Sequence, residues 1–111
     1  MRTKEEWISE FQKIVEENLS NPFFTNTDIA ERMGMSERQF YRSVVNLLGV
    51  PPNAYIREIR LNKAVELIYS GKYATVKEIS LRVGFRKVSY FSKLFEEKEG
   101  CTPASILKKF Y

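Results

Sequence analysis

The sequence predicts an all-α protein of seven helices, in which two helix-turn-helix units are joined by one long connector helix. Apolar residues recur at helical spacing along most of the 111 residues. A pattern of apolar, basic, glycine and proline positions occurs twice. No stretch alternates apolar and polar residues as a strand does, and no Asn-Gly or Asp-Gly hairpin turn is present. A chain of this length favours a single domain, over residues 1–111.

The repeat is the strongest of these signals. Three positions recur 50 residues later and three others recur 51 residues later, as Ile29/Ile79, Arg32/Arg82, Gly34/Gly84, and then Phe40/Phe91, Gly49/Gly100, Pro52/Pro103. The extra residue falls just after Gly84, where a turn can absorb it. A glycine that ends one short helix shortly before another begins is typical of a helix-turn-helix.

Before the first repeat, a capping box of Thr3 and Glu6 predicts the start of a helix that ends at about residue 18–20. Its buried stripe is expected to be Trp7, Phe11, Ile14, Val15 and Leu19, with glutamates on the outer face. Asn21-Pro22 ends this helix. Phe23 and Phe24 are expected to fill the junction with the next one.

The first helix-turn-helix is expected at about 25–50. Thr25 and Asp28 cap a helix that runs to about residue 33, and Ser36 begins a second helix that Gly49 ends. Two prolines then open the connector helix, at about 52–70.

The second helix-turn-helix is expected at about 75–100. Thr75 and Glu78 form a further capping box, and the helix after them ends at Val83. Another helix covers about residues 87–97. Thr102-Pro103 then opens a short last helix.

Composition excludes most catalytic chemistry. The chain has no histidine and a single cysteine, Cys101, so it has no Ser-His-Asp triad, no histidine metal site and no intrachain disulfide. We therefore expect no enzyme, no metal and no cofactor. No apolar run is long enough to cross a bilayer, and residues 1–10 contain no apolar signal region. A cytoplasmic location without membrane contact is expected.

Charge is distributed unevenly along the chain. The net charge is +4, made up of −4 over residues 1–37 and +8 over residues 38–111. The positive part begins where the second helix of the first unit begins. A clustered basic surface is typical of nucleic-acid binders, although solvated helices also carry basic residues.

Two helix-turn-helix units joined by one long helix resemble the DNA-binding domain of the AraC/XylS family of transcription regulators. The resemblance covers about residues 14–110 and is most specific in the second half of the chain. The resemblance is carried, in this order, by residues 64–68, 79–85 and 89–95, then Gly100 and Thr102-Pro103; residues 35–49 are similar to the family's first recognition helix. It implies sequence-specific binding of double-stranded DNA by two recognition helices in adjacent major grooves, and activation through RNA polymerase. Val44-Val45 and Glu96-Glu97 depart from the family pattern, so phosphate contacts are not expected there.

Residues 19–24 and the aromatic-rich second copy are also similar to the output domains of hybrid two-component regulators. The seven expected helices leave no room for a sensing domain in this chain. We therefore expect either a small stand-alone regulator or the output part of a larger protein with an N-terminal sensor or receiver domain. The chain itself is expected to be a monomer, because no apolar stripe is left over once the core is assigned.

The resemblance and the outward-facing spacing together assign the DNA-contacting residues. Base edges are assigned to Arg38, Tyr41 and Arg42 in the first unit, and to Ser89, Tyr90 and Lys93 in the second. The DNA backbone is assigned to Ser36, Arg57, Arg60, Arg86 and Lys87. Two alternatives stay open: Tyr90 packs between helices, and the basic ridge of Arg57, Arg60 and Lys63 pairs with Glu58 or Glu66.

Two other functions remain open at this point. One is a helical protein-interaction module whose basic surface is incidental. The other is a DNA binder without sequence preference, whose affinity falls steeply with salt but does not differ between sites.

Overall fold

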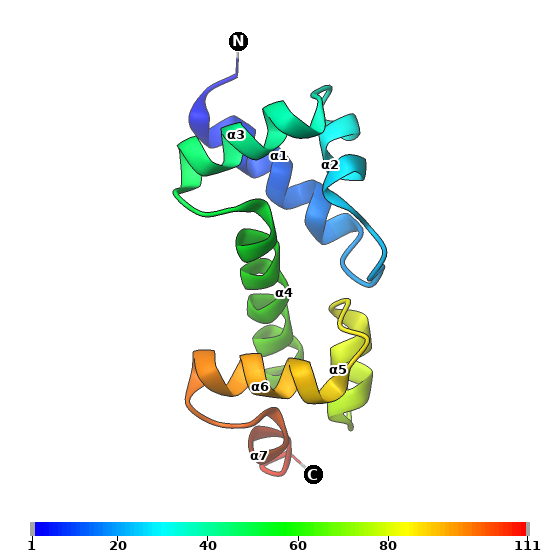
Figure 1. Ribbon diagram of the computed structural model, residues 1–111. Coiled ribbons are helices and arrows are strands. Elements are labelled where there is room, and N and C mark those ends of the chain that lie inside the picture. The colour runs from blue at the N-terminus through cyan, green and yellow to red at the C-terminus, as the bar shows by residue number, and fades with distance from the viewer. Residues whose placement is uncertain (1, 111) are drawn as a thin grey trace. The chain divides into compact units, whose positions relative to one another are not determined.

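The computed structural model describes residues 2–110, and its helices confirm the all-α prediction (Figure 1). The elements are α1 (Lys4–Glu17), α2 (Asn26–Arg32), α3 (Glu37–Leu48), α4 (Pro52–Tyr69), α5 (Val76–Arg82), α6 (Val88–Glu99) and α7 (Pro103–Leu107). No strand occurs within the described residues. Every predicted helix is present, with its ends close to the expected positions.

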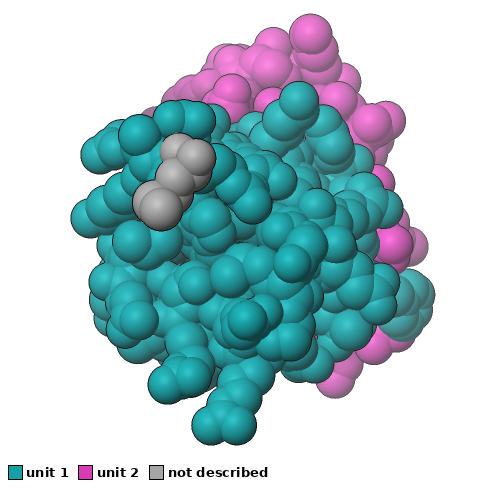
Figure 2. All heavy atoms as spheres, turned by 90° about the horizontal axis from the view of Figure 1, so that it is seen from above, with its two compact units in different colours: residues 1–18, 23–59 teal, residues 19–22, 60–111 magenta. Residues whose placement is uncertain are grey.

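The chain divides into two compact units, coloured teal and magenta in Figure 2. Unit 1 comprises residues 1–18 and 23–59, and unit 2 comprises residues 19–22 and 60–111. The division falls within α4, between Ile59 and Arg60. It also assigns the short segment 19–22, which follows α1, to unit 2.

Unit 1 is built on a cluster of aromatic rings from α1, α3 and α4. Phe11 and Phe40 are fully buried and meet edge to face at 5.1 Å. Tyr55 lies 5.2 Å from Phe11, and Trp7 lies 6.2 Å from Phe40. Such offset and edge-on pairs add to the stabilisation from burial. Burial also raises the pKa of the Tyr55 hydroxyl, and the charge of Glu16 raises it further.

Unit 2 has a corresponding aromatic row. The rings of Phe85 and Phe91 lie 5.4 Å apart, and those of Phe91 and Phe95 lie 5.9 Å apart. All three side chains are buried. Helix α7 packs on α5 and α6 and contributes the buried residues Ile106 and Leu107.

The two predicted turns are alike at the level of single hydrogen bonds. The N–H of Met35 donates to the carbonyl of Ala30 at 2.9 Å, and the N–H of Phe85 donates to that of Ser80 at the same distance. The glycine before each donor has a positive φ, 71° at Gly34 and 89° at Gly84. Such a closure requires a left-handed residue, which explains the repeated glycine.

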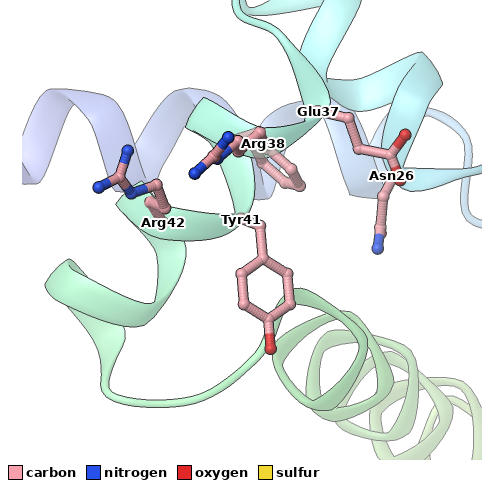
Figure 3. A pocket seen from close by; sticks show the side chains of 6 residues that line it. Asn26, Glu37, Arg38, Tyr41 and Arg42 are labelled. Carbon is pink, nitrogen blue, oxygen red and sulfur yellow. The ribbon is translucent and has the colours of Figure 1, made fainter.

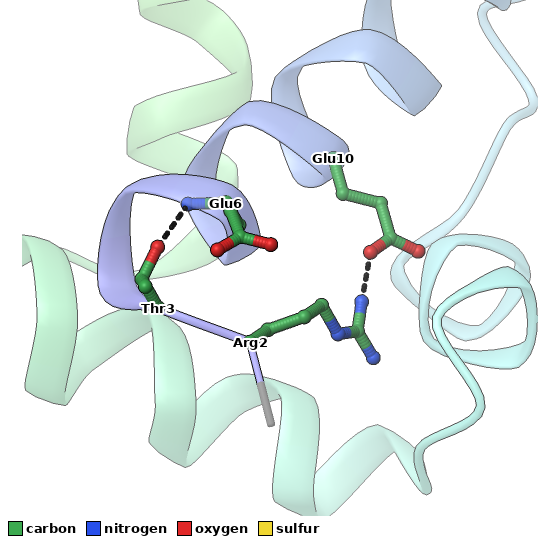
Figure 4. A network of polar contacts seen from close by, with 4 residues as sticks. All are labelled: Arg2, Thr3, Glu6 and Glu10. Atoms are coloured by element: carbon green, nitrogen blue, oxygen red, sulfur yellow. Dashed lines mark hydrogen bonds and ion pairs between the residues drawn. The ribbon is translucent and has the colours of Figure 1, made fainter.

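Helix starts follow the predicted caps, but two of the capping boxes form only in part. Thr25 and Ser36 make complete boxes with the residues three positions on. Thr3 accepts a hydrogen bond from the N–H of Glu6, whose carboxylate does not return one; Figure 4 shows this start of α1, where Arg2 also pairs with Glu10. Thr75 likewise accepts from the N–H of Glu78 alone.

The prediction for Phe23 is wrong. Its side chain is 66% exposed and does not fill the junction between the helices. Phe24 is half-buried, and the Arg32 guanidinium lies 5.1 Å from the centre of its ring. A cation over an aromatic face is a stabilising arrangement. Arg82 lies over Tyr73 in the same way, at 4.7 Å, so the two repeated arginines share a structural role.

The side chain of Arg60 is buried inside unit 2. Its Nη1 atom donates to the carbonyl of Leu19 at 2.5 Å and to that of Val83 at 2.8 Å, and Nη2 lies 3.5 Å from the carbonyl of Asn21. Burial lowers the pKa of the guanidinium. One side chain therefore attaches segment 19–22 to the end of α5.

Replacing Arg60 by methionine should strongly destabilise the protein. The carbonyls of Leu19 and Val83 lose their donor, and a buried carbonyl without a partner costs about 1–3 kcal/mol. The free energy of unfolding, measured by urea denaturation, should fall accordingly. Arg57→Met, an exposed position on the same helix, is the control. Equal losses in the two variants would contradict the role given to Arg60.

Gly84 and Gly34 provide a matched pair, because both have a positive φ but only one is crowded. A Cβ atom on Gly84 would overlap the Arg60 guanidinium and the Leu19 carbonyl, whereas one on Gly34 would meet nothing within 4 Å. Gly34→Ala should cost about 1–2 kcal/mol, the cost of a left-handed residue with a side chain. Gly84→Ala should cost clearly more in the same denaturation experiment. Similar costs at the two positions would contradict the view that the Arg60 guanidinium needs the space left by the absent side chain of Gly84.

Candidate nucleic-acid interface

Helix α3 presents two different faces. Phe40 and Val44 are fully buried in unit 1, which fixes the rotation of the helix about its axis. The three residues assigned to base edges, Arg38, Tyr41 and Arg42, are exposed on the other face, Tyr41 by 50%. Spacings of three and four residues place them side by side on a helix. The structure therefore brings these three residues together, as the sequence predicts.

A groove of about 670 Å³ lies along this face of α3. It is lined by Asn26, Glu37, Arg38, Phe40, Tyr41 and Arg42. In Figure 3 the guanidinium groups of Arg38 and Arg42 lie on one side, the Glu37 carboxylate and Asn26 lie on the other, and the Tyr41 ring extends between them. The groove thus offers hydrogen-bond donors at one side and an acceptor at the other.

Helix α6 repeats this arrangement in unit 2. Phe91 and Phe95 are fully buried, and Ser89, Tyr90 and Lys93 are exposed. The ring of Tyr90 lies 6.1 Å from that of Phe85 and is still 47% exposed. Tyr90 therefore contacts the ring of Phe85, in the turn before α6, and keeps much of its side chain accessible.

The two recognition helices differ at their first turns. At α3, the Ser36 hydroxyl accepts from the N–H of Gln39 at 3.1 Å, and the N–H of Ser36 donates to the Gln39 side chain at 3.0 Å. The N–H of Ser36 is thus occupied, and only its hydroxyl proton is available to a phosphate. At α6, Lys87 is the N-cap residue and makes no side-chain cap. The first N–H groups of α6 are therefore open to an anion, beside the exposed Arg86 and Lys87.

The basic ridge predicted on α4 is not a single surface. Arg57 is exposed, and Lys63 is half-buried and pairs with Glu66 at 3.8 Å, which confirms the structural alternative for that lysine. The assignment of Arg60 to the DNA backbone is wrong. Its guanidinium is buried and occupied by main-chain carbonyls, so it does not reach a phosphate.

Two residues of the groove were missed by sequence reasoning. Asn26 and Glu37 line it, and the Thr27 hydroxyl lies 2.8 Å from a carboxylate oxygen of Glu37. Glu37 begins α3 directly after its N-cap, and this position places it beside Arg38. The Thr27 side chain on α2, which holds the Glu37 carboxylate, belongs to no sequence pattern that predicts this contact.

No group of three or more metal-binding side chains occurs within residues 2–110. None of the helices in this range combines the length and the apolar character that a membrane span needs.

Comparison with known proteins agrees with this geometry. The family described as "Helix-turn-helix domain" matches residues 29–109, which include α3 and α6. The chain belongs to the AraC-type helix-turn-helix family.

Individual curated relatives of this AraC-type domain are much longer than the chain. It is 31% identical to the histidine kinase P4 of Formosa agariphila, covering 96% of the chain and 8% of that protein. It is 31% identical to the transcriptional activator NphR of Rhodococcus sp., covering 92% of the chain and 30% of that protein. The chain therefore spans less than a third of the length of these curated relatives.

Among solved structures, the DNA-binding domain of the global transcriptional factor AdpA, in complex with a target DNA, superimposes with a TM-score of 0.79. The identity is 27%, and the match covers 93% of the AraC-type chain and 91% of the AdpA domain.

Two variants of Ser36 separate its two expected roles. Ser36→Ala removes the N-cap of α3 and should cost about 1 kcal/mol of stability. Ser36→Asp keeps a good N-cap residue but places a negative charge beside the expected phosphate. Its unfolding midpoint should stay close to that of the wild type, while its affinity for all DNA sequences falls. Unchanged affinity of Ser36→Asp would remove Ser36 from the backbone-contacting residues.

Proposed function

We propose that this chain is the sequence-specific DNA-binding part of a transcription regulator, and that α3 and α6 enter adjacent major grooves. One observation carries the proposal. In each unit, fully buried apolar side chains fix the second helix of a helix-turn-helix so that polar and basic side chains lie on its exposed face; these are Phe40 and Val44 in α3, and Phe91 and Phe95 in α6. This is the arrangement in which a recognition helix reads base edges.

The exposed side chains suit the major groove. Arginine and lysine donate to the O6 and N7 atoms of guanine, and serine bonds to more than one base. Arg38 and Arg42 give the first unit two such donors, and Lys93 and Ser89 give the second unit a donor and an adaptable hydroxyl. Each well-placed bidentate pair discriminates against a wrong base by about 1–3 kcal/mol.

The proposed contacts to the DNA backbone come from other residues than the base contacts do. Arg57, Arg86 and Lys87 are exposed cations, and the first turn of α6 has open N–H groups. Contacts of this kind set register and affinity but carry little sequence information. Two helices that read blocks about 34–36 Å apart would lie one turn of DNA from each other.

The full-length protein is proposed to be larger than this chain. The curated relatives include a histidine kinase and a transcriptional activator, of which the chain covers only a small part. These observations support a separate N-terminal sensor or receiver domain in a two-component system, with this chain as its non-catalytic output. Activation through RNA polymerase, in the cytoplasm, completes the proposal.

A selection experiment tests this function. The domain is titrated against a randomised duplex pool by fluorescence anisotropy at two salt concentrations, and the bound DNA is sequenced. Two enriched blocks about one helical turn apart are expected. Arg42→Ala should relax one block and Lys93→Ala the other, each by about 5- to 150-fold in discrimination.

Lys13→Ala is the matched control, because it removes the same charge from an exposed position on α1. It should leave both blocks unchanged. Salt-dependent binding without enrichment would reduce the chain to a non-specific DNA binder. Absence of binding at low salt would favour a protein-interaction module.

A further inference from the structure

A carboxylate lies within the surface proposed to meet DNA. Glu37 is the first residue of α3, it is exposed, and it lines the same groove as Arg38 and Arg42 (Figure 3). A negative charge close to phosphates weakens binding to every sequence. Its place in this groove therefore needs a compensating interaction with particular DNA sequences.

The carboxylate is held in place from the neighbouring helix. The Thr27 hydroxyl on α2 donates to Oε2 of Glu37 at 2.8 Å. No ion pair to Glu37 is present within residues 2–110, although Arg38 is its neighbour in sequence. A carboxylate has about four acceptor positions, and the Thr27 bond uses only one of them. The remaining positions, including those on Oε1, are available to a donor in the groove.

We propose that Glu37 determines specificity by accepting a hydrogen bond from the N4 amino group of a cytosine in the major groove, and that Thr27 positions it. The inference rests on the proposed function, since it needs α3 to enter the groove. Among base edges, the amino group of cytosine is the usual partner of a carboxylate. Guanine and thymine present only acceptor oxygens or nitrogens at the equivalent place, and these repel it.

The effect of Glu37 on selectivity is then mainly exclusion. Arg38 and Arg42 attract any DNA through its phosphates, so by themselves they bind wrong sites too. A held carboxylate lowers affinity wherever the facing base edge is an acceptor, and this loss is recovered at cytosine, whose edge presents the N4 donor. Adenine also has a donor, N6, but it lies beside the N7 acceptor. Discrimination by penalising wrong partners is a general route to specificity.

A simpler explanation is that Glu37 only stabilises α3. A carboxylate in the first turn of a helix interacts favourably with its positive end. Glu5 holds a comparable exposed position in the first turn of α1, outside the groove. Glu5→Gln therefore makes the same change of charge and of helix-end stabilisation without altering the proposed base contact.

The test uses the site enriched by the wild-type chain. Duplexes carrying each of the four bases at every position of the first block are titrated against wild type, Glu37→Gln, Thr27→Val and Glu5→Gln. At one position the wild type should prefer cytosine by about 5- to 150-fold. Glu37→Gln should lose this preference and favour adenine there, because glutamine pairs with the adenine edge. It should also bind non-cognate DNA more tightly than the wild type does.

Thr27→Val should weaken the cytosine preference without creating one for adenine, since the carboxylate remains but is no longer held. Glu5→Gln should leave the pattern of bases unchanged, and thermal unfolding of all variants checks that they fold. A wild-type cytosine preference that persists in Glu37→Gln would overturn the inference while the proposed function stands. If the wild type enriches no site at all, the proposed function and this inference both fail.

Discussion

The hydrogen bonds of the Arg60 guanidinium to main-chain carbonyls are the interaction on which the second unit depends. A buried cation is costly unless its donors are satisfied, and here the partners are the carbonyls of Leu19 and Val83 rather than a carboxylate. Val83 ends α5 and stands immediately before the turn to α6. The Arg60 side chain therefore donates a hydrogen bond to the carbonyl at the end of α5 and also holds segment 19–22 in unit 2. The absence of a side chain at Gly84 leaves the space that the guanidinium occupies.

The two units share a turn but not its surroundings. Gly34 has the same left-handed backbone as Gly84, yet no atom lies where its side chain would be. At the first turn, the support comes from polar contacts at the start of α3: the Ser36 capping box and the Thr27–Glu37 bond. The two copies of the repeat thus share one backbone requirement, the positive φ of the glycine. The contacts that fix the second helix differ between them.

Most of the fold could be predicted from the sequence, because helix periodicity, caps and left-handed glycines are local features. The buried stripe of α1 followed from spacing alone. The predictions that failed concern residues whose surroundings are formed by partners distant in sequence. Arg60 has the spacing of a surface ridge, and only the carbonyls of Leu19 and Val83, 41 and 23 residues away, make its burial possible. Phe23 failed for a related reason, since apolar character does not decide which residue of a loop turns inward. The outward faces of the recognition helices were predictable, whereas the Thr27–Glu37 contact joins two helices and was not.

The charge distribution suggests that the two units contribute differently to binding. Unit 1 carries a net charge of −2, and the groove of α3 combines two arginines with a carboxylate and a capped helix start. Such a surface gains little general attraction to phosphate, so its contacts favour discrimination. Helix α6 begins without a side-chain cap beside Arg86 and Lys87, in unit 2, whose net charge is +6. General affinity falls with salt in proportion to the phosphates neutralised, whereas base contacts depend on salt much less. We therefore expect the salt dependence of binding to come mainly from unit 2, and sequence preference to persist longest, as salt rises, at the block read by unit 1.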